Sequence, residues 1–245
     1  MKAAKIAALH IFSARQQAYS GDSFLARSRV RRNFAEVKIF SPPRIESLLD
    51  KVDRDRLRQI QSRYANSAER YAKYADVERW LKINIARAQD LGLGLDRTGP
   101  QEILDVGCGA GFFLFVAKQF GHTCLGLDVD DFPASNELID LFGVERVTWR
   151  VRAFQPLPVF ERKFDLITAF STAFNRNEDE TSGWAGAEWS FFLDDLNRYL
   201  KPGGEIFFEI NSGKDGRYFR DDVRQLFLQR GATVNGEFVR FPGKL

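Results

Sequence analysis

The chain has 245 residues, of which 44% are hydrophobic and 28% are charged, a composition typical of a large globular domain. No stretch approaches the roughly 18 consecutive apolar residues of a membrane span. The two cysteines, Cys108 and Cys124, fit neither a disulfide framework nor a metal site. These features predict a cytoplasmic protein with no structural metal.

The small net charge of +3 hides an uneven distribution along the chain. Residues 1–74 contain 16 Lys and Arg against 7 Asp and Glu, whereas residues 75–245 contain 20 against 26. A basic segment of this kind can bind an anionic partner such as nucleic acid. Alternatively, the segment is a solvated helical arm or docks onto the acidic remainder of the chain. We favour this second interpretation, because no RNA-binding module surrounds the basic run 27–32.

The first 99 residues are predicted to form a helical extension. Apolar residues recur at helical spacing over 2–18, 45–57 and 62–91, and turn-forming residues interrupt the pattern at 20–22 and 41–43. The third of these helices carries a row of aromatic side chains. Glycines at 92, 94 and 99 end it before the first predicted strand.

A glycine-rich segment follows at 103–113 and reads ILDVGCGAGFF. An apolar run ends in Asp105, and Gly107, Gly109 and Gly111 come at alternate positions before a new apolar run. This pattern predicts a buried strand, a tight turn and a helix whose free N–H groups face a ligand. A dinucleotide-binding fingerprint would have its third glycine where this chain has Phe112, which argues against a dehydrogenase.

Strands and helices are then predicted to alternate. A strand over 123–129 delivers Asp128 to its carboxyl end, where an acidic side chain can accept hydrogen bonds from both hydroxyls of a ribose. A helix over 134–142 and strands over 144–151 and 163–170 follow. A helix over 188–200, a strand over 205–211 and a helix over 215–230 continue the pattern. This order predicts a parallel sheet flanked by helices.

The D-x-G-x-G-x-G pattern at 105–111, the acid at Asp128 and the LKPGG turn at 200–204 together resemble the class I S-adenosylmethionine-dependent methyltransferases. The resemblance covers about residues 100–241 and implies a Rossmann-like, doubly wound α/β fold with a mainly parallel seven-stranded sheet. Its last strands are expected to be short or partly absent, because 232–234 and 237–241 form either a hairpin or one final strand. The expected division is a helical extension at 1–99 and a cofactor-binding domain at 100–245.

The resemblance also implies S-adenosylmethionine as the cofactor and S-adenosylhomocysteine as its product. In the family the glycine loop lies beneath the methionine part and the acid after the second strand binds the ribose. Many relatives carry an Asp for the adenine after the third strand, but this chain has Arg152 there, so the backbone of Ala153 and the ring of Phe154 are expected to hold the adenine. The predicted cofactor-binding residues are Asp105, Gly107, Cys108, Gly109, Gly111, Phe112, Asp128, Val129, Ala153, Phe154 and Phe170.

The methyl acceptor is less constrained by the sequence. Segment 171–189 follows the fourth strand at the edge where open α/β sheets bind ligands, and helices before the glycine loop often cap the cofactor site in the family. The predicted acceptor contacts are Tyr71, Tyr74, Phe174, Asn175 and Trp184, with Asp131 and Asn175 as candidates for catalysis and Arg63, Tyr64 and Lys73 as further cap residues. For the cap aromatics, packing on the core is the alternative. Neither His10 nor His122 is favoured as a general base.

Three functional hypotheses follow. Methyl transfer to an oxygen or nitrogen of a small molecule is favoured. The basic N-terminal third supports an RNA- or protein-directed methyltransferase as the alternative. The missing adenine acid and the lack of an obvious base leave a catalytically inactive cofactor-binding scaffold as the third.

Overall fold

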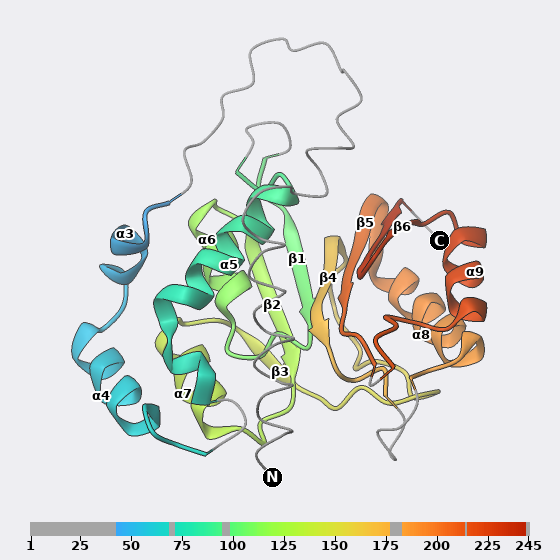
Figure 1. Ribbon diagram of the computed structural model, residues 1–245. Coiled ribbons are helices and arrows are strands. Elements are labelled where there is room, and N and C mark those ends of the chain that lie inside the picture. Colours follow the sequence, from blue (N-terminus) through green and yellow to red (C-terminus); the bar gives the residue numbers. More distant parts are fainter. Residues whose placement is uncertain (1–42, 69–71, 95–98, 177–182, 214, 244–245) are drawn as a thin grey trace.

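The computed structural model describes residues 43–68, 72–94, 99–176, 183–213 and 215–243. They form a seven-stranded sheet in the order β3-β2-β1-β4-β5-β7-β6, in which β7 runs antiparallel to both β5 and β6 and the other neighbouring strands are parallel (Figure 1). The strands are β1 (Glu102–Val106), β2 (Thr123–Asp128), β3 (Arg146–Thr148), β4 (Phe164–Thr172), β5 (Leu200–Ile210), β6 (Thr233–Asn235) and β7 (Phe238–Pro242). The predicted helix at 2–18 and Tyr71 lie outside the described residues.

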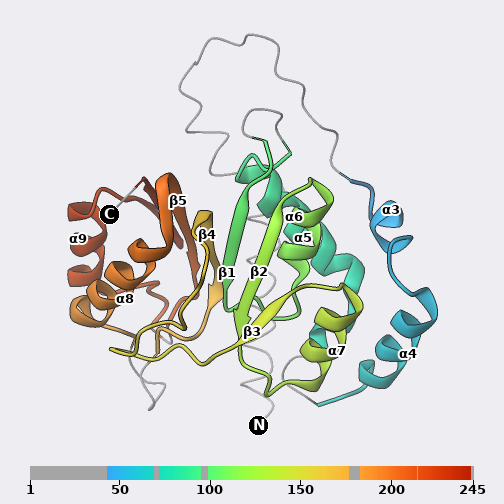
Figure 2. The same ribbon diagram turned by 180° about the vertical axis from the view of Figure 1, so that it is seen from behind.

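Helices cover both faces of the sheet (Figures 1 and 2). One face carries α5 (Val77–Asp90), α6 (Phe112–Gln119) and α7 (Pro133–Leu141), and the other carries α8 (Gly186–Tyr199) and α9 (Asp221–Gln229). Because successive side chains of a strand point to opposite faces, Ile103 packs in the first core and Leu104 in the second. The fold is therefore the predicted Rossmann-like α/β architecture.

The C-terminal end of the sheet settles the alternative left open by the sequence. Strands β6 and β7 pair as a hairpin through Asn235 and Phe238, which confirms the first of the two expectations. Strand β5 already begins at Leu200, so the LKPGG segment lies within it, where the pairing with β4 is irregular between Phe164 and Leu166. Helix α9 begins at Asp221, later than predicted.

The predicted helices over 45–57 and 62–91 are wrong in their boundaries. The chain forms α3 (Ile45–Leu49), α4 (Arg54–Tyr64), a 3-10 turn η1 (Ala72–Ala75) and α5. Asp53 and Asp76 each begin a new helix, because their carboxylates accept the backbone N–H groups three residues ahead at 2.9 and 3.4 Å. The apolar pattern runs through both breaks because α3, α4 and α5 bury side chains in one core. None of the helices in the described part of the chain is long and apolar enough to cross a membrane.

Replacing Phe208 with Ala tests the core beneath α8. The Phe208 ring is fully buried and contacts Trp189, Phe192 and Phe241. We expect the free energy of unfolding in urea to fall by about 3–5 kcal/mol, because the change leaves a cavity. The matched control is Phe154→Ala. Phe154 is 56% exposed, so this substitution should lower the free energy of unfolding by less than about 1 kcal/mol. Equal losses for the two variants would contradict this account of the core.

Candidate functional site

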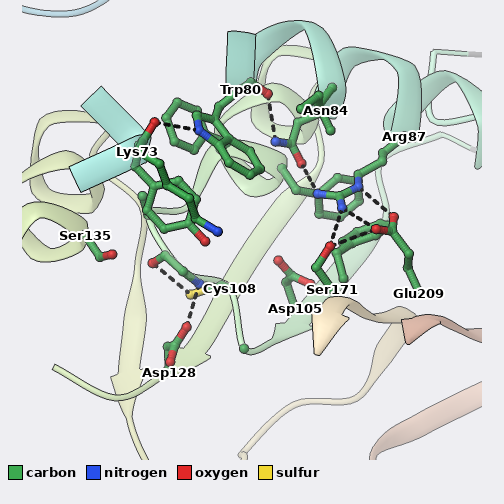
Figure 3. Close-up of a pocket in the computed structure, with 18 of the residues that line it drawn as sticks. Lys73, Trp80, Asn84, Arg87, Asp105, Cys108, Asp128, Ser135, Ser171 and Glu209 are labelled. Atoms are coloured by element: carbon green, nitrogen blue, oxygen red, sulfur yellow. Dashed lines mark hydrogen bonds and ion pairs between the residues drawn. The ribbon is translucent and has the colours of Figure 1, made fainter. Parts of the chain in front are cut away.

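A cavity of about 730 Å³ lies at the carboxyl ends of β1, β2, β4 and β5 (Figure 3). Its floor is the glycine loop between β1 and α6. The opposite wall, formed by η1 and α5, is called the cap here, and α5 is the cap helix. The volume is in the range of small-molecule sites. The carboxyl ends of parallel strands are also where open α/β sheets bind ligands, so both size and position indicate a binding site.

The glycine loop follows a path that other residues would strain. Gly107, Gly109 and Gly111 all have positive φ angles, of 77°, 56° and 75°. A Cβ at Gly109 would come within 3.3 Å of the Tyr74 hydroxyl oxygen, and one at Gly111 within 3.0 Å of Ile139. Any larger residue at these positions would therefore fill the space between the loop and the cap or push α6 away from α7.

Asp128 ties the glycine loop to the end of β2. Its Oδ2 accepts the N–H of Gly109 at 2.6 Å and its Oδ1 accepts the N–H of Val129 at 2.7 Å. Burial raises the pKa of Asp128, while these two hydrogen bonds and the charge of Arg146 oppose the rise. A carboxylate oxygen has further lone pairs, so Asp128 can still accept hydrogen bonds from ligand hydroxyls.

Asp105 lies near the end of β1 and is more deeply buried than Asp128. Its side chain is buried and accepts a hydrogen bond from the Thr168 hydroxyl at 2.8 Å. Burial raises the pKa of Asp105 to about 7, although Thr168 and the charge of Arg87 act in the opposite direction. The carboxyl is thus partly protonated near neutral pH, and a ligand cation beside it would favour its ionised form.

A buried ion pair closes the other end of the cavity. Arg87 of α5 binds Glu209 of β5 through both carboxylate oxygens, with Nε–Oε2 and Nη2–Oε1 distances of 3.0 and 2.8 Å. The guanidinium also donates to Ser171 at 3.0 Å and to Asn84 at 3.2 Å. It lies over the ring of Phe170, 4.5 Å from the centroid. These contacts join the cap helix to the ends of β4 and β5.

Ser171 adopts an unusual backbone conformation within this cluster. Its φ is +51°, and the pairing of β4 with β5 shifts register between Phe170 and Thr172. The irregularity directs its hydroxyl to Glu209, to which it donates at 2.8 Å, while Asn211 donates to its carbonyl oxygen. Left-handed conformations of residues other than glycine are costly and gather at functional sites.

Most of the predicted cofactor residues line the cavity. These are Asp105, Gly107, Cys108, Gly109, Phe112, Asp128, Val129 and Phe170, and the cap residues Lys73 and Tyr74 and the acceptor candidate Phe174 join them. Gly111 lies just behind the wall as the N-cap of α6. Arg63 and Tyr64 instead bind Glu137 of α7.

The other predicted residues within the described part of the chain do not line this cavity. Trp184 is buried among Phe174, Trp189 and Phe192, and its backbone N–H donates to the carbonyl oxygen of Asn175, which is also buried. Asp131 is exposed and forms an ion pair with Arg150. Ala153 and Phe154 lie in a neighbouring loop, where Phe154 has a φ of +57° and touches Phe191.

Several lining residues were missed by the sequence analysis, namely Trp80, Asn84, Arg87, Ser135, Ser171 and Glu209. One signal was present for two of them. Asn84 and Arg87 are polar residues on the buried face of α5, between Leu81 and Ala88. A polar pair on the apolar stripe of an amphipathic helix indicates a buried polar contact.

His122 is not placed for catalysis, as expected. It lies beside the start of β2, at the edge of the sheet opposite the cavity. Its Nδ1 accepts the N–H of Gln101 at 3.1 Å and its Nε2 donates to the carbonyl of Leu93 at 2.9 Å. Within the described residues no group of His, Cys, Asp and Glu side chains is arranged to hold a metal ion.

Comparison with known proteins finds one matching domain family. Residues 104–208 match the family model described as a methyltransferase domain, a segment that runs from β1 through the glycine loop and Asp128 to β5. The matched segment, which is less than half of the chain, supports the resemblance to the class I S-adenosylmethionine-dependent methyltransferases. This match agrees with the strand order and with the position of the cavity.

The matches to individual methyltransferases are distant. Two tRNA U34 carboxymethyltransferases, from Campylobacter curvus and Nautilia profundicola, are 26% and 24% identical over 111 residues, which is 44% of this chain and 34% of each relative. The chain thus matches about a third of the length of these relatives. The PH0226 protein from Pyrococcus horikoshii has a TM-score of 0.46 at 15% identity, covering 66% of this chain and 91% of its own. Streptomyces venezuelae DesVI has a TM-score of 0.44 at 14% identity, with coverage of 80% and 100%.

The pKa of Asp105 predicts how stability depends on pH. The folded chain keeps this proton up to about pH 7, whereas the unfolded chain loses it near pH 4. The folded state therefore binds more protons between these values, and its stability falls as the pH rises. From pH 5 to pH 8 we expect the free energy of unfolding of the wild type to fall by about 2–3 kcal/mol relative to Asp105→Asn, measured in urea. Parallel pH profiles would contradict this assignment.

Proposed function

We propose that this chain transfers a methyl group from S-adenosylmethionine to an oxygen or nitrogen atom of a small molecule. The observation that supports this best is the link between Asp128 and the N–H of Gly109. It places a carboxylate that can bind a ribose directly beside a glycine loop at the N-terminus of α6, within one cavity. An adenosine joined to an amino acid fits these two features.

The polar groups of the cavity match those of the cofactor. Asp128 is suited to the vicinal hydroxyls of the ribose, since a carboxylate accepts hydrogen bonds from both. Asp105 is suited to the ammonium group of the methionine part, whose positive charge would lower the pKa of this carboxyl from about 7. Gly109 has no side chain of its own over its backbone, and a Cβ there would come within 3.3 Å of the Tyr74 hydroxyl oxygen. The cofactor supplies a methyl group on a positively charged sulfur.

The contribution of the chain to the reaction is mainly positioning. The Arg87–Glu209 pair fixes α5 against the sheet, so the cap can hold an acceptor in one orientation relative to the glycine loop. An acceptor nitrogen that is neutral at the working pH needs no general base, which suits a cavity without a histidine in the described residues. A hydroxyl acceptor would need a base to remove its proton.

The lining of the cap end supports a small polar acceptor. Asn84, Ser171 and Asn211 provide hydrogen-bonding groups there, and Trp80 and Phe170 provide apolar surface. A few placed polar groups on an aromatic wall are typical of sites for small molecules. Trp184 lends no support, because it is buried in the core behind Phe174.

Calorimetric titration with S-adenosylhomocysteine tests the cofactor assignment. We expect the wild type to bind, and Asp128→Ala to lose about 1–3 kcal/mol of binding free energy because a charge-assisted partner is removed. The matched control is Asp131→Ala, an exposed carboxylate paired with Arg150 outside the cavity, which should bind like the wild type. Absence of binding by the folded wild-type chain would overturn the proposal.

An RNA acceptor is the second candidate, supported by the tRNA-directed names of the curated relatives and by the basic residues of segment 1–74. Filter binding of unfractionated tRNA to the whole chain distinguishes the two. An RNA-directed enzyme should bind with an affinity that falls at least tenfold between 50 and 200 mM salt, because phosphate contacts release counterions. Binding that is absent at 50 mM salt would leave the small-molecule acceptor as the favoured class.

A scaffold that binds the cofactor without turnover is the third candidate. Its support is the absence of an acid at the predicted adenine position, where the chain has Arg152. Methyl transfer from labelled S-adenosylmethionine to any fraction of a cell extract would exclude it.

A further inference from the structure

Ser135 has a buried hydroxyl without a hydrogen-bond partner in the described part of the chain. The residue is 4% exposed and lies in the first turn of α7. A hydroxyl removed from water without a partner costs about 1–3 kcal/mol. Such a cost in a folded protein calls for a functional explanation, because nearly all buried polar groups are paired.

The side chain faces the cavity proposed for the cofactor. Ser135 and Phe132, the N-cap of α7, both contribute to its wall beside Asp128 and Val129. Figure 3 shows the Ser135 hydroxyl pointing inward, on the same side of the cavity as Asp128 and below Lys73. Rotation about the Cα–Cβ bond moves the oxygen between staggered positions, so it can turn to a ligand without movement of the backbone.

The chemistry of Ser135 complements that of Asp128. An ionised carboxylate only accepts hydrogen bonds, and both oxygens of Asp128 already accept a backbone N–H. The two hydroxyls of a ribose can donate to these oxygens, but their own lone pairs then need a donor. A serine hydroxyl can supply one. The N-terminal end of α7, which has nine residues, also favours an electronegative atom at this place.

We propose that Ser135 is a further cofactor-binding residue that donates a hydrogen bond to a ribose hydroxyl oxygen of S-adenosylmethionine, on the same side of the cavity as Asp128. This inference rests on the proposed function, since it takes the same cavity as the cofactor site. It adds a donor from α7 to a ribose site that otherwise consists of an acceptor on β2. The vicinal diol would then meet both a hydrogen-bond acceptor and a hydrogen-bond donor.

Calorimetry on the full chain tests the assignment, with S-adenosylhomocysteine and its 2′-deoxy and 3′-deoxy analogues as ligands. We expect Ser135→Ala to weaken binding of S-adenosylhomocysteine about three- to tenfold, the range of one hydrogen bond. For one of the two deoxy analogues, the affinity of the variant should equal that of the wild type, because the hydroxyl that Ser135 contacts is already gone. The melting temperature of the ligand-free variant should not fall, because no hydrogen bond is lost.

Asn136→Ala is the matched control on the next position of α7. Asn136 donates to the carbonyl of Asp130 at 2.7 Å and accepts from Arg146, and it does not line the cavity. Its loss should lower the melting temperature and leave the affinity within twofold. Wild-type affinity in Ser135→Ala, or an equal loss for all three ligands, would overturn the role of Ser135 alone. Failure of the wild type to bind S-adenosylhomocysteine would overturn the proposed function as well.

Discussion

The buried ion pair between Arg87 and Glu209 is the contact on which the shape of the cavity depends. It joins α5, which precedes the sheet in the sequence, to β5, and the two residues are 122 positions apart in the chain. Removing one partner of such a pair leaves an unpaired buried charge, at a cost of about 3–5 kcal/mol. Moving helix α5 away from the sheet would therefore break the Arg87–Glu209 pair. This pair holds the cap in place over the cavity. Ser171 takes its strained conformation within the same cluster.

The two carboxylates of the floor show how neighbouring strand ends create different chemical environments. Asp128 is held by two backbone N–H groups, which favour its ionised form despite burial. Asp105 is fully enclosed and accepts a hydrogen bond from the Thr168 hydroxyl, and burial raises its pKa to about 7. Asp128 at the end of β2 thus has backbone donors that support its ionised form, whereas the charge of Asp105 near the end of β1 depends on the ligand. The glycine loop brings both within reach of one molecule.

The parts of the fold predicted from sequence are those encoded over short distances. The glycine spacing, Asp128 and the alternation of strands and helices are local patterns, and each has its structural counterpart. The helix breaks at Asp53 and Asp76 were missed because a capping aspartate can also sit on the exposed face of a continuous helix. The polar pair on the buried face of α5 was a signal for Arg87, but its pairing with Glu209 and the role of Ser135 could not be foreseen, because they depend on which distant elements meet. Trp184 was chosen as a loop aromatic, but its surroundings are set by α8 and β5.

The ends of the sheet have a consequence for the behaviour of the molecule in concentrated solution. Both edge strands, β3 and β6, are three residues long, whereas β5 in the interior has eleven. An edge strand presents unpaired N–H and C=O groups to which a strand of another chain can add. Short edges offer few such groups, so the long hydrogen-bonded strands are kept away from neighbouring molecules. The strand order that creates the cavity thus also puts the two shortest strands, with the fewest unpaired backbone groups, at the edges of the sheet.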